Sequence, residues 1–139
     1  MKKNEAVTKV MSSNPVSVGQ NESVSAARRL LEEKGIHHLP VTDGDRLVGI
    51  LTATDFLRVS FGDFGNQNGR SLDAMLDHTY TIVDLMNSAP TTISNDQTVR
   101  DAATVLATSS FHSLPVVNGQ TLVGIVTSSD LIHYLLEQY

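Results

Sequence analysis

The sequence predicts an α+β fold in which two consecutive β-α-β-β-α repeats pack through their small sheets with pseudo-twofold symmetry. One constant shift aligns Val10–Ser60 with Leu85–Leu135 without a gap, and such self-similarity is the signature of a repeated structural unit. All four prolines fall in matched pairs. Because one copy alone buries little apolar surface, we expect the two copies to fold together. The predicted boundaries are repeat 1 at 1–60, a linker or flap at 61–80 and repeat 2 at 81–139.

Repeat 1 opens with the patterns of a strand and a helix. Val16–Val18 follows Pro15, and its β-branched residues predict a short extended segment. Ser23 then suits the N-cap of a helix, and Gly35 suits its left-handed C-cap. Spacings of three, four and seven place the apolar residues of this helix on one buried face, namely Val24, Ala27, Leu30 and Leu31.

Repeat 2 shows the same order of patterns. Thr91–Ile93 after Pro90 predicts the extended segment, and Thr98 with Asp101 resembles a capping box at a helix start. Ser110 stands where repeat 1 has its C-cap glycine, so no glycine marks the end of this helix. The residues expected on the buried helix face are Val99, Ala102, Ala103 and Leu106.

A hairpin and a final helix complete each repeat. Asp-Gly and Asn-Gly supply the positive φ angles that tight hairpin turns require. The predicted strands are His38–Thr42 and Arg46–Thr52 around Asp43-Gly44-Asp45, and Ser113–Val117 and Thr121–Thr127 around Asn118-Gly119-Gln120. The predicted last helices are Thr54–Ser60 and Ser129–Glu137. Within the linker, Leu72, Met75 and Leu76 are spaced for a short helix.

The composition narrows the classes of function. The net charge is −5 without a basic stretch, whereas nucleic-acid binders carry a basic footprint, so we expect no DNA or RNA partner. No apolar run approaches the roughly 20 residues that span a membrane, and the charged start lacks the apolar part of a secretory signal. The absence of cysteine removes disulfides, thiolate nucleophiles and cysteine-based metal sites. We therefore expect a cytoplasmic protein with no membrane partner and no metal site.

The segment Gly49–Asp55, repeated as Gly124–Asp130, is the main candidate for binding chemistry. It joins a strand end to a helix start, and its glycine lets a ligand or a backbone approach closely. Unpaired N–H groups and the dipole at the helix start favour phosphate, and the ionised carboxylates of Asp55 and Asp130 suit the paired hydroxyls of a ribose. Because Thr-x-x-Asp at a helix start is also a capping arrangement, both interpretations stay open. The hydroxyls that can add donors are those of Thr52, Thr54, Thr127, Ser128 and Ser129.

The motifs of both copies, taken in the order in which they occur, resemble those of a CBS domain. The second copy carries Asp84-Leu85-Met86, Pro90, Thr98–Ala103, His112–Val117 and Gly124–Asp130, and the first matches through Val10-Met11, Pro15, Ser23-Val24, Gly35–Thr42 and Gly49–Asp55. Two such repeats form a Bateman module, and the likeness covers nearly the whole chain except the linker. The resemblance implies a stand-alone, bacterial-type tandem CBS protein. Such a protein is a regulatory module that binds an adenosine nucleotide (AMP, ADP or ATP) in the cleft between its repeats and signals by conformational change.

The resemblance also implies roles for individual residues. Asp55 and Asp130 hold the ribose diol in this picture, and the phosphate is met by Thr52 and Thr127 with Thr54 and Ser129 beside them. The adenine lies among Val16, Ser17, Val18, Leu39 and Pro40 in one copy, and among Thr91, Thr92, Ile93, Leu114 and Pro115 in the other. His37, His38 and His112 precede the Leu-Pro-Val runs, where basic residues of the family often face phosphates.

The two copies differ where phosphate is expected. Ser113 stands where repeat 1 has His38, and neither copy has arginine there, so we expect two unequal pockets without tight triphosphate binding. His37 and His112 are equally well explained as hydrogen-bonded histidines at a strand start. Arg58 and His133 reach phosphate or lie exposed on the last helices, and we favour exposure.

Other functions compete with the nucleotide sensor. The chain could be a ligand-free oligomerisation scaffold, although both aspartates argue against this, or a sensor of S-adenosylmethionine or NAD(H). The motifs of hydrolases, P-loop proteins, metalloproteases and Rossmann dehydrogenases are missing, so we expect no enzyme, no catalytic residue and no required cofactor. The resemblance further implies a homodimer, a four-repeat disc formed through helices, and an effector protein that the sequence does not identify. The apolar stretch Leu131–Leu136 fits such an interface, and core packing explains it nearly as well.

Overall fold

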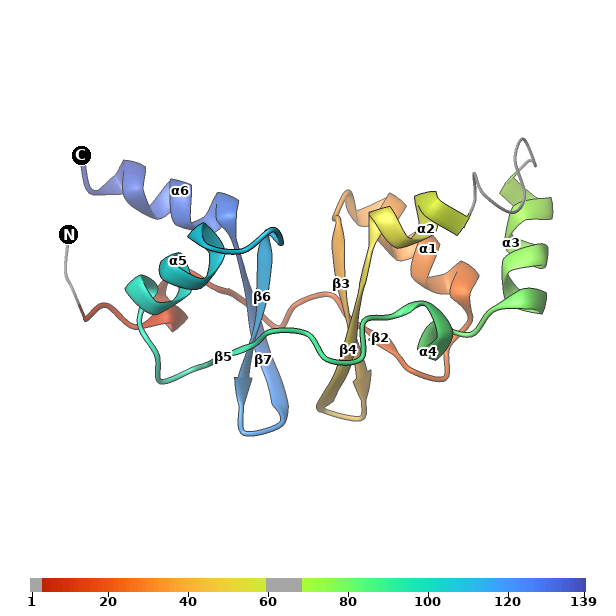
Figure 1. Cartoon of the computed structure of the whole chain (residues 1–139), viewed down its shortest axis with the longest axis horizontal. Helices are drawn as coiled ribbons and strands as arrows, with labels where there is room; N and C mark the ends of the chain where they lie inside the picture. Colours follow the sequence, from red (N-terminus) through yellow and green to blue (C-terminus); the bar gives the residue numbers. More distant parts are fainter. Residues whose placement is uncertain (1–3, 60–68) are drawn as a thin grey trace. The chain divides into compact units, whose positions relative to one another are not determined.

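The computed structural model describes residues 4–59 and 69–139, with the side chains of residues 58, 59, 70 and 71 left out. It confirms a mixed α+β chain with small sheets and accompanying helices (Figure 1). The chain forms two compact units, which do not coincide with the two sequence repeats. Unit 1 comprises Met1–Pro15, Asp45–Leu47 and Pro90–Tyr139, and unit 2 comprises Val16–Gly44 and Val48–Ala89.

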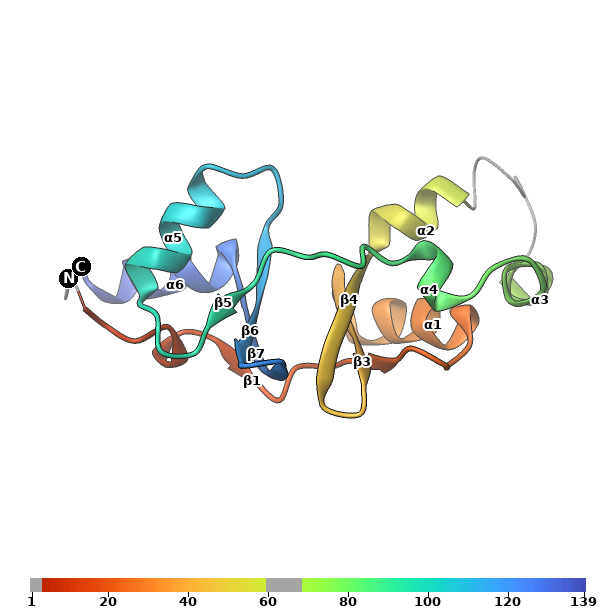
Figure 2. The same cartoon turned by 60° about the horizontal axis from the view of Figure 1, so that its bottom comes forward.

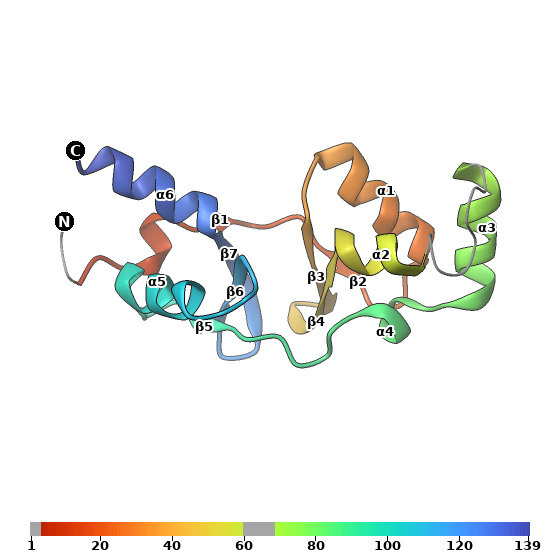
Figure 3. The same ribbon diagram turned by 45° about the horizontal axis from the view of Figure 1, so that its top comes forward.

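Unit 2 contains a small sheet and a group of helices. Its elements are β2 (Val18–Gly19), α1 (Val24–Lys34), β3 (His38–Asp43), most of β4 (Arg46–Thr52), α2 (Ala53–Val59), α3 (Gly69–Thr79) and α4 (Ile82–Leu85). β2 is parallel to β3, with Val18 opposite Val41, and β3 neighbours β4. The turn after β3 contains Gly44 at φ 63°, the conformation that the Asp-Gly pattern predicts. Both α2 and α3 pack against α1 (Figure 3).

Unit 1 repeats this arrangement. Its elements are the 3₁₀ helix η1 (Val7–Lys9), β1 (Ser12–Ser13), β5 (Ile93–Ser94), α5 (Val99–Ala107), β6 (Ser113–Asn118), β7 (Thr121–Thr127) and α6 (Ser128–Glu137). β5 is parallel to β6, with Ile93 opposite Val116, and β6 forms an antiparallel hairpin with β7 around Gly119 at φ 66°. α5 and α6 pack against each other (Figure 1).

The start of β4 belongs to unit 1 because it pairs with β7. The N–H of Leu47 donates to the carbonyl oxygen of Gln120 at 3.0 Å, and the N–H of Leu122 donates to that of Asp45 at 3.0 Å. These two hydrogen bonds join the same positions of the repeat, since Leu122 and Gln120 are the counterparts of Leu47 and Asp45 in the second copy. The start of the second hairpin strand in repeat 1 is thus hydrogen-bonded to the start of the same strand in repeat 2.

The predicted caps of α1 and the predicted start of α5 are confirmed, whereas α2 and α6 each begin one residue earlier than predicted, at Ala53 and Ser128. The hydroxyl of Ser23 accepts a hydrogen bond from the N–H of Ala26 at 3.1 Å, and α1 ends at Gly35 with φ 62°. The helix expected within the linker is α3. α5 ends at Thr108, with φ −103°, and not at a left-handed residue. Ser60, the predicted end of α2, lies outside the described residues.

The first strand of each repeat begins two residues and ends one residue later than predicted. The sequence placed extended segments at Val16–Val18 and Thr91–Ile93, whereas the paired strands are Val18–Gly19 and Ile93–Ser94. Strand assignment requires a partner, and only these later residues lie beside the parallel strands β3 and β6. The β-branched pattern therefore predicts the region of each first strand but not its exact bounds.

Each unit has its own apolar core. The core of unit 2 includes Val24, Ala27 and Leu31 on the predicted face of α1, together with Leu76 of the linker helix. The core of unit 1 includes Ala102 and Leu106 on the corresponding face of α5. Within the described ranges, no helix combines the length and the apolar character needed to cross a membrane.

The segments that open the two repeats are exchanged between the copies. Val7, near the start of repeat 1, is buried in the core of unit 1, and Ile82, its counterpart at the start of repeat 2, is buried in the core of unit 2. β1 then pairs with β7 (Figure 2). In unit 2, Asn87 and Ile50 exchange backbone hydrogen bonds of 2.9 and 3.0 Å. No local pattern of the sequence predicts this exchange, although Met11 and Met86 occupy the same position in the two segments.

Gly49 and Gly124 make room for the exchanged segments. A Cβ atom on Gly49 would stand 2.5 Å from the Met86 sulfur and 2.9 Å from the Asn87 carbonyl oxygen. A Cβ atom on Gly124 would collide with the Met11 sulfur and stand 3.0 Å from the Ser12 carbonyl oxygen. The sequence predicted that a ligand or a backbone could approach both glycines closely. In the structure, a methionine side chain and a neighbouring backbone carbonyl group occupy that space at each glycine.

We predict that Gly49→Ala and Gly124→Ala each lower the free energy of unfolding by about 1–3 kcal/mol, the usual cost of overpacking. Urea unfolding of each variant measures this loss. Adding Met86→Ala to Gly49→Ala should remove part of the clash, so the double variant loses less stability than the sum of the single variants. An alanine that is tolerated without loss at both positions would contradict this account of the glycines.

The capping box of α5 ties a carboxylate to a helix start. The N–H of Thr98 donates to Asp101 Oδ2 at 3.0 Å, and the N–H of Asp101 donates to Thr98 Oγ1 at 3.1 Å. The bond from the Thr98 N–H holds the pKa of Asp101 below its ordinary value. Asp84 in α4 has the same arrangement with Thr81, and its pKa is also lowered. Both carboxylates therefore favour the folded state only while they are ionised.

We predict that part of the stability depends on pH through Asp101. Because its folded pKa lies below its unfolded pKa, its contribution is complete above the unfolded value and is lost as the pH falls through the folded value. Urea midpoints measured from about pH 6 down to about pH 3 should fall less steeply for Asp101→Asn than for the unchanged chain. Asp96→Asn, a change of an exposed aspartate outside the box, is the control. Equal slopes for Asp101→Asn and the unchanged chain would contradict the prediction.

Candidate functional site

In unit 1, the predicted site residues converge where β7 ends and α6 begins. The N–H of Thr127 donates to Asp130 Oδ2 at 2.8 Å, and the N–H of Asp130 donates to Thr127 Oγ1 at 3.1 Å. The N–H and the hydroxyl of Ser128 donate to the carbonyl oxygen of His112, at 2.9 and 3.4 Å. We call this the Asp130 corner, made of His112 and Thr127–Asp130. Asp130 Oδ1 accepts no hydrogen bond from the part of the chain that the structure describes, so this oxygen can accept one from a ligand while the other caps the helix.

Unit 2 has a related arrangement, the Asp55 corner, made of His37 and Thr52–Asp55. The N–H and the hydroxyl of Thr52 both donate to Asp55 Oδ2, at 2.9 and 3.1 Å, and the N–H of Asp55 donates to Thr52 Oγ1 at 3.3 Å. The N–H of Ala53 donates to the carbonyl oxygen of His37 at 3.0 Å. Ala53 stands where the other corner has Ser128, so this corner has one hydroxyl fewer at the helix start.

The capping interpretation of both Thr-x-x-Asp motifs is confirmed. The same local geometry begins α4 and α5, where Thr81 with Asp84 and Thr98 with Asp101 form capping boxes. Capping alone therefore does not distinguish a binding corner from an ordinary helix start. The two corners differ from those boxes because each lies directly after a hairpin strand and holds the backbone of a histidine three residues before a proline. Capping occupies Oδ2 of each aspartate, which is compatible with a ligand at the corner.

The predicted ligand-binding residues differ in exposure. The exposed ones are Val16, Ser17, His37, Thr54, Thr91, Thr92, His112 and Ser129. The half-buried ones are His38, Thr52, Asp55, Thr127 and Asp130, together with Ser128. The buried ones are Val18, Leu39, Pro40, Ile93, Leu114 and Pro115.

Burial limits what the predicted adenine-lining residues can offer. The side chains of Val18 and Leu39 belong to the core of unit 2, and those of Ile93 and Leu114 belong to the core of unit 1. Their side chains are packed inside the units, so only their backbone groups remain for a ligand at these residues. Exposed neighbours in the same segments, such as Val16 and Thr92, have accessible side chains.

The two corners are unequal at the positions where phosphate was expected. His38 is half-buried, whereas Ser113 at the matching position is buried in β6, opposite Thr127. His133 is exposed on α6, as the sequence analysis favoured. The side chain of Arg58 lies outside the described residues.

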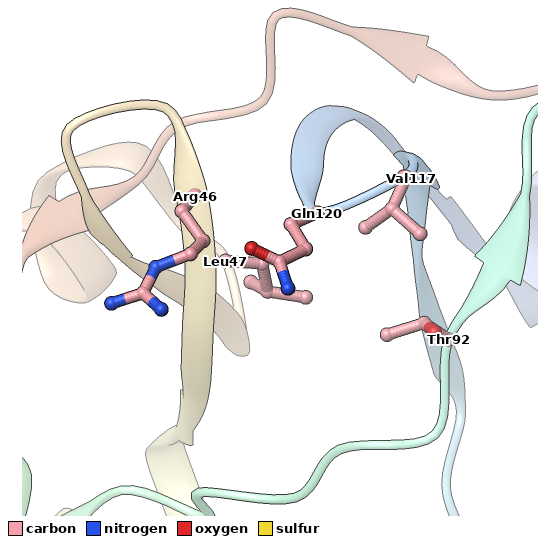
Figure 4. A pocket seen from close by; sticks show the side chains of 6 residues that line it. Arg46, Leu47, Thr92, Val117 and Gln120 are labelled. Atoms are coloured by element: carbon pink, nitrogen blue, oxygen red, sulfur yellow. The ribbon is translucent and has the colours of Figure 1, made fainter.

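A small pocket lies beside the tip of the β6–β7 hairpin in unit 1. Its volume is about 220 Å³, below the roughly 300–1,000 Å³ of pockets for drug-sized ligands. In this pocket Leu47 points toward Gln120, and the Arg46 guanidinium extends away from Thr92 and Val117 (Figure 4). Thr92 was predicted as a site residue, and no sequence pattern marked the others as ligand-binding. Its lining residues are Arg46, Leu47, Thr92, Val117, Gly119 and Gln120.

The pocket and the Asp130 corner lie toward opposite ends of β7. That strand runs from Thr121, next to the pocket-lining Gln120, to Thr127 at the corner. Six residue steps along an antiparallel strand cover about 20 Å. The pocket is therefore no part of the corner itself.

Comparison with known protein families matches the CBS domain model twice, at residues 7–62 and 82–137. A relative from Methanocaldococcus jannaschii, an uncharacterized protein, is 32% identical over 97% of this chain, which spans 33% of that protein's length. Hypoxic response protein 1 of Mycobacterium tuberculosis is 28% identical to this chain, and the match covers 92% of this chain and 83% of the length of that protein. Both matches extend across the two repeats.

Two solved structures with a similar fold contain adenosine compounds. Arabidopsis thaliana CBSX2 in complex with AMP has a TM-score of 0.79 and 29% identity, covering 96% of this chain and 97% of its own. The CBS domain pair of protein MJ0100, in complex with 5′-methylthioadenosine and S-adenosylmethionine, has a TM-score of 0.74 and 26% identity, covering 94% of this chain and 98% of its own.

Proposed function

Since this chain belongs to the CBS-domain family through both of its repeats, we propose that it is a non-catalytic regulatory module that binds an adenosine nucleotide. The observation that carries the proposal is the pair of Thr-x-x-Asp corners, one in each unit, with a carboxylate at a strand–helix junction. CBSX2 holds AMP, and the MJ0100 pair holds two other adenosine compounds. Adenosine is the part that these ligands share, so we assign the ribose diol to the aspartates.

The corners also favour a particular kind of ligand. Each aspartate lies in the first turn of a helix, where backbone N–H groups and the helix dipole attract an anion. The histidine and hydroxyl groups nearby are modest phosphate partners, and no arginine stands before either Leu-Pro-Val run. We therefore propose AMP or ADP as better ligands than ATP, with unequal affinity at the two corners. In this proposal, binding changes the packing of the repeats and so signals to an effector protein, in the cytoplasm.

We predict that AMP or ADP raises the melting temperature, because a ligand at about 100 times its dissociation constant adds about 2.7 kcal/mol to the stability. Asp55→Ala and Asp130→Ala should each remove the binding at one corner, since hydrogen bonds to a charged group contribute about 1.5–3 kcal/mol. Calorimetric titration of each variant with AMP, ADP, ATP, NAD(H) and S-adenosylmethionine measures the affinity and the number of sites.

The chain provides matched controls for this experiment. Asp84→Ala and Asp101→Ala break capping boxes of the same Thr-x-x-Asp geometry, and both variants should keep full nucleotide affinity. If they weaken binding as much as Asp130→Ala does, the corners act only through helix stability. The absence of binding by every compound would leave the oligomerisation scaffold, and a preference for S-adenosylmethionine or NAD(H) would change the identity of the signal.

We also propose a homodimer that forms through α6. Ile132, Leu135 and Leu136 follow one another at helical spacing on α6 and are 57%, 40% and 64% exposed, so they form one uncovered apolar face. The inner side of α6 is formed by Leu131 and Tyr134, which are half-buried. The family resemblance supports a second copy of the chain as the group that covers this face.

We predict that Leu136→Glu dissociates the dimer, because a charge would be buried without a partner at the interface. Sedimentation equilibrium at micromolar concentration reports the mass of the particle. His133→Glu, on the same helix but off the apolar face and likewise exposed, should leave the dimer intact. An unchanged chain that sediments as a monomer would refute the proposal.

A further inference from the structure

The linker helix α3 makes polar contacts with α1 that neither repeat predicts. α3 lies between the two aligned halves of the sequence and packs against α1 (Figure 3). Leu76 anchors it, since this side chain is fully buried in the core of unit 2. On the same side of α3, Asp73 and Asp77 lie one turn apart and both contact α1. The linker helix therefore joins unit 2 through apolar side chains, among them Leu76 and Leu72, and through two carboxylates that contact α1.

The first turn of α1 lacks an acid that its counterpart possesses. In α5, the N-cap Thr98 is followed three residues later by Asp101, and the two form a capping box. The equivalent positions of α1 are Ser23 and Ala26. Ser23 caps the helix with its hydroxyl, but the first turn of α1 contains no acidic residue. Repeat 1 thus carries only half of a capping box.

Asp77 supplies a carboxylate at this place from another part of the chain. Its Oδ1 accepts a hydrogen bond from the N–H of Ser25 at 2.8 Å, and its Oδ2 accepts one from the Ser25 hydroxyl at 2.6 Å. Ser25 is only 2% exposed, so its N–H, one of the first-turn donors that have no partner within a helix, has little access to water. A carboxylate at a helix amino terminus is also favoured by the helix dipole.

Asp73 extends the contact by one turn along α1. Arg28 Nε donates to Asp73 Oδ1 at 2.6 Å, and Arg29 Nε lies 3.9 Å from Asp73 Oδ2. Arg28 also pairs with Glu32 at 3.1 Å. Arg28 and Asp73 are mostly covered, with exposed side-chain fractions of 22% and 19%. These ion pairs fix the position of α3 along α1 so that Asp77 lies next to Ser25.

We propose that α3 is a strap that places the carboxylate of Asp77 on the N–H and hydroxyl of Ser25, in the first turn of a helix that has no acid of its own there, so that the linker controls the order of α1. A force or a partner that pulls the linker away would open the first turn of α1. It would leave α5 unaffected, because α5 carries its own capping acid. The two repeats would then respond differently to one event in the linker. This inference does not rest on nucleotide binding.

Amide hydrogen exchange offers equivalent reporters in the two helices. The N–H of Ala27 donates to the carbonyl oxygen of Ser23 at 3.3 Å, and the N–H of Ala102, its counterpart in repeat 2, donates to that of Thr98 at 3.1 Å. Asp77→Asn should speed the exchange of the Ala27 amide about fivefold, the factor that corresponds to a typical lost cap. The exchange of the Ala102 amide should not change. Asp101→Asn should show the reverse pattern.

A second variant separates capping from packing. Ala26→Asp places an acid at the position that Asp101 occupies in α5, where it can accept a hydrogen bond from the Ser23 N–H and complete the capping box of α1. This bond differs from those of Asp77 to Ser25, but it returns a carboxylate to the first turn, so the double variant with Asp77→Asn should regain slow exchange at Ala27. In this double variant the Tyr80 amide, which donates to the Leu76 carbonyl oxygen at 2.8 Å at the end of α3, should still exchange faster than in the unchanged chain. Unchanged exchange at Ala27 in Asp77→Asn would overturn the proposal. Exchange at Ala27 that stays fast in the double variant would also overturn the proposal. This second test applies even if Asp77→Asn alone unfolds the chain.

Discussion

The contact of Met86 with Gly49, and of Met11 with Gly124, is the constraint on which both units depend. Each methionine belongs to the opening segment of one repeat, and each glycine belongs to the hairpin of the other. The backbone passes so close to the glycine that no side chain fits between them. Val7 and Ile82 then enter the cores beyond these contacts. A single repeat therefore does not contain its own complete core, and this is why the sequence carries the unit twice.

The exchange also explains how the binding corners are built. Gly49 and Gly124 lie three residues before Thr52 and Thr127, on the strands that lead into the corners. The close contact at the glycine fixes the position of the strand, and so also the position of the threonine and aspartate that follow it at the helix start. The carboxylate then caps the helix with one oxygen. The same residues thus serve the fold and, in the function that we propose, the ligand.

The two repeats are less alike in space than in sequence. The first helix of repeat 2 has the carboxylate of Asp101 in its own first turn, whereas the first helix of repeat 1 has none there and is contacted by Asp77 of the linker helix. Repeat 1 has His38 beside its corner, whereas repeat 2 has the buried Ser113. These differences concern charged and polar groups, while the apolar cores remain closely similar. Equivalent positions of the two repeats are buried in both cores, whereas the polar groups at the corners differ, which permits two corners of unequal affinity.

The sequence alone determined the local structure of this protein. Periodic apolar residues, Ser23 and Thr98 as N-caps, and the Asp-Gly and Asn-Gly turns depend on neighbours a few residues away, so their patterns are readable without coordinates. The motif set also identified the family, and it placed Asp55 and Asp130 at helix starts.

Only the tertiary structure decided which distant segments meet. The exchange of Met11 and Met86 between the copies, the cap that Asp77 gives to α1, and the burial of Val18 and Leu114 in the cores all join residues far apart in the chain. Local patterns carry no information about such pairings, because their stability comes from contacts that exist only after the chain has folded.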